Sequence, residues 1–158
     1  MPDNWRTAYL RQSRSDYEIF KMLLSVPNVP LCQRLHYLQM ATEKLSKALM
    51  TEGTMRPARS HDAFVRFLQT ASRRPEIRRA FGYERRTQFA AVINGILPQA
   101  QLVEDLSPEG PDHPNPEYPW ESGGSITSPL DYRFPGLHFE NTRMGKLMKF
   151  LEQCFELG

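Results

Sequence analysis

The chain of 158 residues carries 20 basic and 18 acidic side chains, which gives a formal net charge of only +2, and 40% of its residues are hydrophobic. This length suffices to bury roughly 70% of the unfolded chain's surface, so we expect one compact domain over residues 1–158. No run of about 18 apolar residues occurs, and residues 1–30 lack an uninterrupted apolar core. We therefore expect neither a membrane span nor a signal peptide, and a cytoplasmic location.

The first predicted helix runs to about residue 24, with Asp3 or Asn4 as its N-cap. Asp16 falls inside its apolar stripe, and a buried carboxylate needs a cation or several hydrogen-bond donors. Lys44 and Lys47 on the next helix are the nearest candidates by pattern. We expect a structural ion pair, and the alternative is a ligand-binding role for Asp16 together with Lys47.

The second predicted helix spans residues 31–51. Its apolar residues recur at steps of three and four, and few of its residues are β-branched. These apolar residues are Leu31, Leu35, Leu38, Ala41, Leu45, Ala48 and Leu49. A neighbouring stripe contains His36, Met40, Glu43 and Lys47, in which the acid precedes the amine by four residues, the favourable order for an ion pair.

The remaining apolar periodicity predicts a third helix from the N-cap Ser60 to about residue 71, a short turn over 75–81, and a fourth helix over 84–106 that Pro98 should kink. A last helix covers 141–157. The fold class is then all-α, an up-and-down bundle of about five helices with a long proline-rich loop before the last one. Its expected centre is formed by Leu38, Leu45, Val92, Ile96 and Leu151.

That loop, residues 107–138, holds seven of the thirteen prolines and shows no helical period. A loop of this length is either functional or disordered. Its aromatic residues would be costly to leave in water, so we expect it to fold over the helices and to be ordered. They are Tyr118, Trp120, Tyr132 and Phe134, and Phe139 directly follows the loop.

Charge is segregated along the chain. Residues 56–86 contain nine arginines against three acids, whereas residues 104–140 contain eight acids and one base, Arg133. Guanidinium groups suit phosphate oxygens, so the basic stretch is a candidate surface for phosphate or nucleic acid. It could equally meet the acidic stretch in a dimer, or form an ordinary solvated helix face.

Cys32 and Cys154 lack Cys-x-x-Cys spacing and fit reduced core thiols. Cys32 shares a helix face with His36, but two further metal ligands are not in sight, so we expect no metal site. Nothing in the sequence implies a cofactor.

Several motifs together resemble the HEPN family, the higher eukaryotes and prokaryotes nucleotide-binding helical domains. The second helix and the following loop match the pattern at Gln39, Ala41, Glu43-Lys44, Lys47-Ala48-Leu49, Gly53 and His61-Asp62. Trp5, Ala8 and Asp16 match its first helix, and Tyr118-Pro119 matches a Tyr-Pro before its last helix, where the family often has Arg in place of Glu117. The resemblance implies a helical bundle; the family includes ribonucleases, toxin components, nucleotide binders and inert scaffolds.

Ribonuclease members of the family use an Arg followed four to six residues later by His. The guanidinium can hold the scissile phosphate, the imidazole can transfer a proton, and no metal is needed. Arg56 with His61 and Arg133 with His138 fit this spacing. The residue after each Arg is Pro57 or Phe134, where family nucleases tend to have a polar residue, and His61 could instead bond the preceding loop.

The leading interpretation is noncovalent binding of nucleotide or RNA phosphate by a homodimer, as the companion of a nucleotidyltransferase, which the resemblance implies. The expected ligand-binding residues are Lys44, Lys47, Arg59, Arg78 and Arg79. One alternative is a metal-independent endoribonuclease of toxin type, with Arg56 and His61 as the catalytic pair. The other is an inert helical interaction module, in which the acidic loop would cover the arginine-rich surface.

Overall fold

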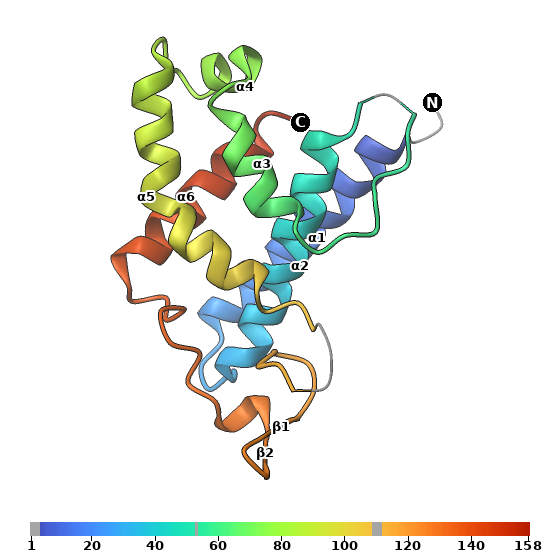
Figure 1. Cartoon of the computed structure of the whole chain (residues 1–158), viewed down its shortest axis with the longest axis vertical. Coiled ribbons are helices and arrows are strands. Elements are labelled where there is room, and N and C mark those ends of the chain that lie inside the picture. The colour runs from blue at the N-terminus through green and yellow to red at the C-terminus, as the bar shows by residue number, and fades with distance from the viewer. Residues whose placement is uncertain (1–3, 53, 109–111) are drawn as a thin grey trace.

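The computed structural model describes residues 4–52, 54–108 and 112–158; the alternative cap Asp3 and the motif residue Gly53 lie outside them. Within these ranges the chain forms six α-helices, one short 3-10 helix and a two-stranded sheet, which confirms the predicted all-α bundle (Figure 1). No helix in this described part is long and apolar enough to cross a membrane. The elements are α1 (Trp5–Ser25), α2 (Leu31–Met50), α3 (Ala63–Ala71), α4 (Pro75–Ala80), α5 (Arg86–Glu104), β1 (Trp120–Ser122), β2 (Ser125–Thr127), η1 (Pro129–Asp131) and α6 (Thr142–Phe155).

The first two helices pack along each other, as their apolar stripes predict. Asn4 caps α1, because its side-chain oxygen accepts a hydrogen bond from the Thr7 N–H at 2.9 Å. The Ser13 hydroxyl, fully buried, donates to the carbonyl of Ala41 on α2 at 2.6 Å. A small polar residue at this point allows the two backbones to approach closely.

The predicted ion pair of Asp16 is confirmed. Its side chain is 5% exposed, and its Oδ2 lies 2.5 Å from Nζ of Lys44, which is 25% exposed. Gln12, one turn earlier on α1, donates to the other carboxylate oxygen at 3.2 Å. The partner is therefore Lys44, and Lys47 points to a different acid.

The core lies between α1, α2, α3, α5 and α6. Leu38, Leu45, Ile96 and Leu151 are all at most 2% exposed, as expected. Val92 was expected among them, but it is only partly buried and lines a surface groove instead. Phe89 and Ile93 of α5 point into the core, so Val92, which is adjacent to Ile93, lies at the edge of the apolar stripe of this helix.

The third helix begins at Ala63, two residues later than an N-cap at Ser60 predicts, so the assignment of Ser60 as its N-cap was wrong. The start is capped from another helix: the carboxylate of Glu104, the last residue of α5, accepts the Val65 N–H at 2.9 Å. A carboxylate supplied across the bundle satisfies donors at the first turn of α3, so no local Ser cap is needed.

The fifth helix continues through Pro98 without a break, and Figure 1 shows that it changes direction part-way along, as a proline inside a helix predicts. Its first half lies beside α6, and its last residues reach the start of α3 (Figure 1). The helix therefore connects the two ends of the bundle.

The segment expected to be irregular contains a β-hairpin. Trp120 and Phe134 are buried, at 4% and 2% exposure, and both contact Tyr132 edge-on, with ring centroids 5.1 and 4.9 Å apart. The expectation of buried aromatic residues therefore holds for these two, whereas Tyr118 is 62% exposed. Figure 1 shows the hairpin at the lower end of the molecule, opposite α4.

Candidate functional site

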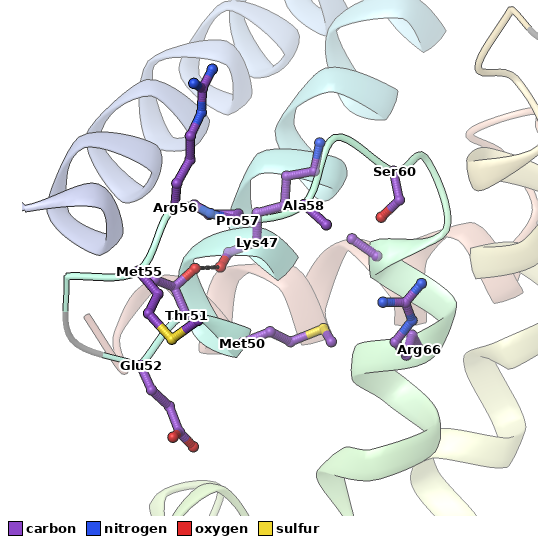
Figure 2. Close-up of a pocket in the computed structure, with 11 residues that line it drawn as sticks. Lys47, Met50, Thr51, Glu52, Met55, Arg56, Pro57, Ala58, Ser60 and Arg66 are labelled. Carbon is purple, nitrogen blue, oxygen red and sulfur yellow. Dashed lines mark hydrogen bonds between the residues drawn. The ribbon is translucent and has the colours of Figure 1, made fainter.

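A pocket of about 290 Å³ opens between the end of α2, the loop of residues 54–62 and the start of α3 (Figure 2). It is the place where two predicted site residues, Lys47 and Arg56, line one cavity. Met50 and Met55 give it an apolar, adaptable wall. The other lining residues are Thr51, Glu52, Pro57, Ala58, Ser60, Ala63 and Arg66.

One turn before Lys47 on α2, the carboxylate of Glu43 contacts three hydrogen-bond donors. Its carboxylate accepts from Lys47 at 2.6 Å and from Gln39 at 3.0 Å, and Nδ1 of His61 lies 3.2 Å from it. Burial alone would raise the pKa of Glu43, but the hydrogen bonds from Lys47 and His61 outweigh it and lower this pKa. The favourable order of Glu43 and Lys47 in the sequence thus gives a real ion pair, and His61 joins it from the next element.

The guanidinium groups near this pocket are also engaged within the chain. Arg56 stands over the ring of Trp5, 5.2 Å from its centroid, and Figure 2 shows its side chain directed along α1. Arg66 pairs with Asp62 one turn before it. Each positive group at the pocket therefore already has an acid or an aromatic face, which reduces its attraction for an added anion.

Arg56 and His61 are not brought to a common point. Arg56 lines the pocket just described, whereas His61 lines a neighbouring one of about 220 Å³ that also contains Glu104, Ser107 and His113. Burial raises the pKa of Glu104, and the backbone N–H groups that it accepts at the start of α3 act in the opposite direction. No group of three or more potential ligand side chains within the described ranges is arranged to hold a metal ion.

The second Arg-His pair lies on the long loop, where Arg133 and His138 are both exposed. Glu117, which precedes Tyr118-Pro119, has its own partner: its Oε1 lies 3.4 Å from Nδ1 of His36 on α2. Nδ1 of His36 is buried and has no hydrogen-bond partner among the residues that the structure describes. The contact ties the loop to α2.

A second candidate surface surrounds α4. We call Arg73, Arg78, Arg79, Arg85 and Arg86 the α4 basic cluster. All but Arg78, which is half-buried, are exposed. Among the residues that the structure describes, no carboxylate lies within ion-pair distance of these five arginines, and the same holds for Arg59.

The backbone under the α4 basic cluster is fixed by a helix-ending motif. The Gly82 N–H donates to the carbonyl of Arg79 at 2.9 Å, and the Tyr83 N–H donates to that of Arg78 at 3.1 Å. This is the Schellman pattern, which needs a left-handed residue, and Gly82 has φ of 80°. The chain turns sharply there, between Arg79 near the end of α4 and Arg85, which directly precedes α5.

Aromatic packing anchors this turn to the core. Phe81 stacks on Phe150 of α6 with centroids 4.9 Å apart, and Tyr83 stacks on Phe89 of α5 at 5.3 Å. At the other end of α4, Arg74 donates to the carbonyl of Leu49 at 3.1 Å. The cluster therefore stands on a rigid base, which favours binding because little chain entropy is lost.

Of the predicted ligand residues, Lys44 and Lys47 are held in ion pairs, and Arg59, Arg78 and Arg79 lack a carboxylate partner in the described part of the chain. Sequence reasoning missed the contacts of His61 with Glu43 and of Arg56 with Trp5, because both join separate elements and leave no spacing signal.

No protein family, curated protein or solved structure matches this chain.

Proposed function

We propose that this protein binds the phosphate groups of RNA or nucleotide noncovalently, through the α4 basic cluster. The observation that carries the proposal is the absence of carboxylate partners for five clustered arginines within the described residues, while the guanidinium groups at the α2–α3 pocket are already engaged. Guanidinium groups that have no carboxylate partner attract phosphate strongly, and this attraction does not depend on the nucleotide sequence of the RNA.

Within the residues that the structure describes, the acidic loop does not neutralise this surface. Its Glu117 lies against His36, and the hairpin lies at the opposite end of the molecule from α4 (Figure 1). This arrangement favours phosphate binding over an inert module, in which acidic and basic stretches of one chain would cover each other. A role as the cytoplasmic companion of a nucleotidyltransferase remains part of the proposal and rests on the HEPN resemblance.

A second candidate function is a metal-independent endoribonuclease, and one contact favours it. The 3.2 Å contact of Glu43 with Nδ1 of His61 leaves Nε2 available, and the His61 side chain is 49% exposed. A carboxylate that orients an imidazole is a common arrangement for general acid–base catalysis. One observation counts against a ribonuclease: Arg56 stands over Trp5 and lines a different pocket from His61. In a catalytic pair, these two side chains would have to contact the same phosphate.

The test measures binding and cleavage on the same RNA. We expect a fluorescently labelled RNA to bind the wild type in low salt, and Arg78→Ala with Arg79→Ala to weaken this binding. Arg6→Ala with Arg11→Ala on α1 is a charge-matched control. Equal binding by the wild type and the α4 variant would contradict the proposal. In a digestion time course with chelator, robust cleavage by the wild type that is lost in His61→Ala would establish the ribonuclease instead.

A further inference from the structure

The β1–β2 hairpin holds an apolar side chain out in solvent. Gly123 and Gly124 have φ of 58° and 80°, which makes the tight two-residue turn that suits the twist of paired strands. Glu121 lies opposite Ile126 across the strands, and the pleat places this pair on the face opposite Trp120. Trp120 is therefore buried, whereas Ile126 is 81% exposed.

Exposed apolar and acidic side chains lie opposite Ile126 in the hairpin and shortly after it in the sequence. Leu130 on η1 is 64% exposed, and Glu121 and Asp131 are exposed without a cationic partner in the described ranges. A hairpin with three-residue strands is marginal by itself, and here the ring contacts of Tyr132 anchor it. The hairpin thus presents an exposed apolar tip beside acidic side chains, which suits a surface that is apolar and basic.

A groove with an apolar floor and basic residues in its lining lies between α5 and α6. It has a volume of about 340 Å³, and its floor is formed by Val92, Ile96 and Phe150. Gly95 leaves this floor open, since a Cβ there would have no neighbour within 4 Å. Lys146 and Lys149 of α6 line the groove, are exposed, and have no acidic partner in the part of the chain that the structure describes.

We infer that the β1–β2 hairpin of one copy of this chain docks into the α5–α6 groove of a second copy. Ile126 would fill the apolar floor, and Glu121 and Asp131 would face Lys146 and Lys149. Figure 1 shows the hairpin projecting from the lower end of its own molecule, away from the first half of α5. The apolar areas are small, so the complementary charges give the contact its specificity. The inference is independent of phosphate binding, since none of these residues belongs to the α4 basic cluster.

The first experiment is sedimentation velocity over a range of protein concentrations. We expect the wild type to self-associate, and Ile126→Asp to raise the dissociation constant at least about tenfold. Met22→Asp is the matched control, because Met22 is an apolar α1 residue that is 57% exposed; it should associate as the wild type does. A wild type that stays monomeric throughout, or an Ile126→Asp protein that associates normally, overturns the inference.

Charge reversal tests the pairing itself. Lys146→Glu with Lys149→Glu should abolish association, and adding Glu121→Lys with Asp131→Lys to the same chain should restore it. Circular dichroism of each variant confirms that the helices persist. If the fourfold variant is folded and does not associate, the proposed pairing is wrong.

A crosslinking experiment locates the contact. Protein with Ile126→Cys is mixed with protein carrying Gly95→Cys and treated with a short bismaleimide; the native cysteines Cys32 and Cys154 are buried and should stay unreactive. A crosslinked dimer is expected from this mixture, and none from Met22→Cys with Gly95→Cys. Equal yields in the two mixtures would show random collision and overturn the inference.

Discussion

Replacing Lys44 by Met tests the buried charge that joins α1 to α2. The two partners differ in exposure: the Asp16 side chain is 5% exposed and that of Lys44 is 25% exposed. Removal of the lysine leaves a buried carboxylate that still accepts a hydrogen bond from the Gln12 amide but has lost its cation, so we expect a loss of about 3–5 kcal/mol in the free energy of unfolding. Asp16→Asn leaves a lysine that can reach water, and should cost only about 1–2 kcal/mol.

For a chain of this size each kcal/mol shifts the melting temperature by roughly 2–4 °C, so Lys44→Met should melt about 6–20 °C below the wild type. Calorimetry and urea unfolding of the two single variants and the double variant give the coupling energy. The double variant should lose less than the sum of the two single losses. The reasoning fails if Lys44→Met is within about 1 kcal/mol of the wild type, or if Asp16→Asn is the more costly change. Binding of RNA by the folded double variant should equal that of the wild type; a loss would instead support a ligand role for Asp16 or Lys44.

Three further outcomes can be checked. If each arginine of the α4 basic cluster contacts one phosphate, log K for a single-stranded RNA should fall with log salt with a slope of about −3.5, and Arg78→Ala with Arg79→Ala should change it to about −2.1 in an anisotropy titration; an unchanged slope excludes these contacts. Folding lowers the pKa of Glu43, so the stability that its carboxylate contributes is present above the ordinary pKa and is lost as pH falls through the lowered pKa. Between about pH 6 and about pH 3, the free energy of unfolding should therefore fall less for Glu43→Gln than for the wild type. Equal decreases in urea unfolding at the two pH values would refute this. Gly136 has φ of 81°, and a Cβ there would lie 2.8 Å from Leu102, so Gly136→Ala should cost roughly 1–2 kcal/mol in urea unfolding, of which Leu102→Ala should recover only part; full recovery would show that the backbone angle is not strained.

The helical part of the fold could be predicted because its signals are local. The apolar period of α2 places Leu38 and Leu45 in the core, and the position of Asp16 within such a stripe indicates a buried acid that needs a cation. Which lysine serves it could not be predicted, since Lys44 and Lys47 are one turn apart and the choice depends on how α2 is rotated against α1. Val92 shows the same limit: one residue of rotation separates the core from a groove.

The hairpin was missed, although a signal for it exists. Two glycines between short runs that contain Trp120 and Ile126 indicate a two-residue turn, but the prolines on both sides hide the alternation. The contacts of His61 and Arg56 carry no comparable signal. They join a loop to α2 and to α1, and only the assembled fold determines their distances.

The folded structure determines which cationic side chains are available to bind an anion. The sequence offers lysines of α2 and arginines of residues 56–86 as equal candidates, yet Lys44 and Lys47 are engaged by Asp16 and Glu43. An anion that bound these lysines would have to compete with an acid that is already desolvated, whereas an anion at the α4 basic cluster competes only with water. Salt-sensitive binding should therefore follow the arginines around α4, and the lysines of α2 should affect stability rather than binding.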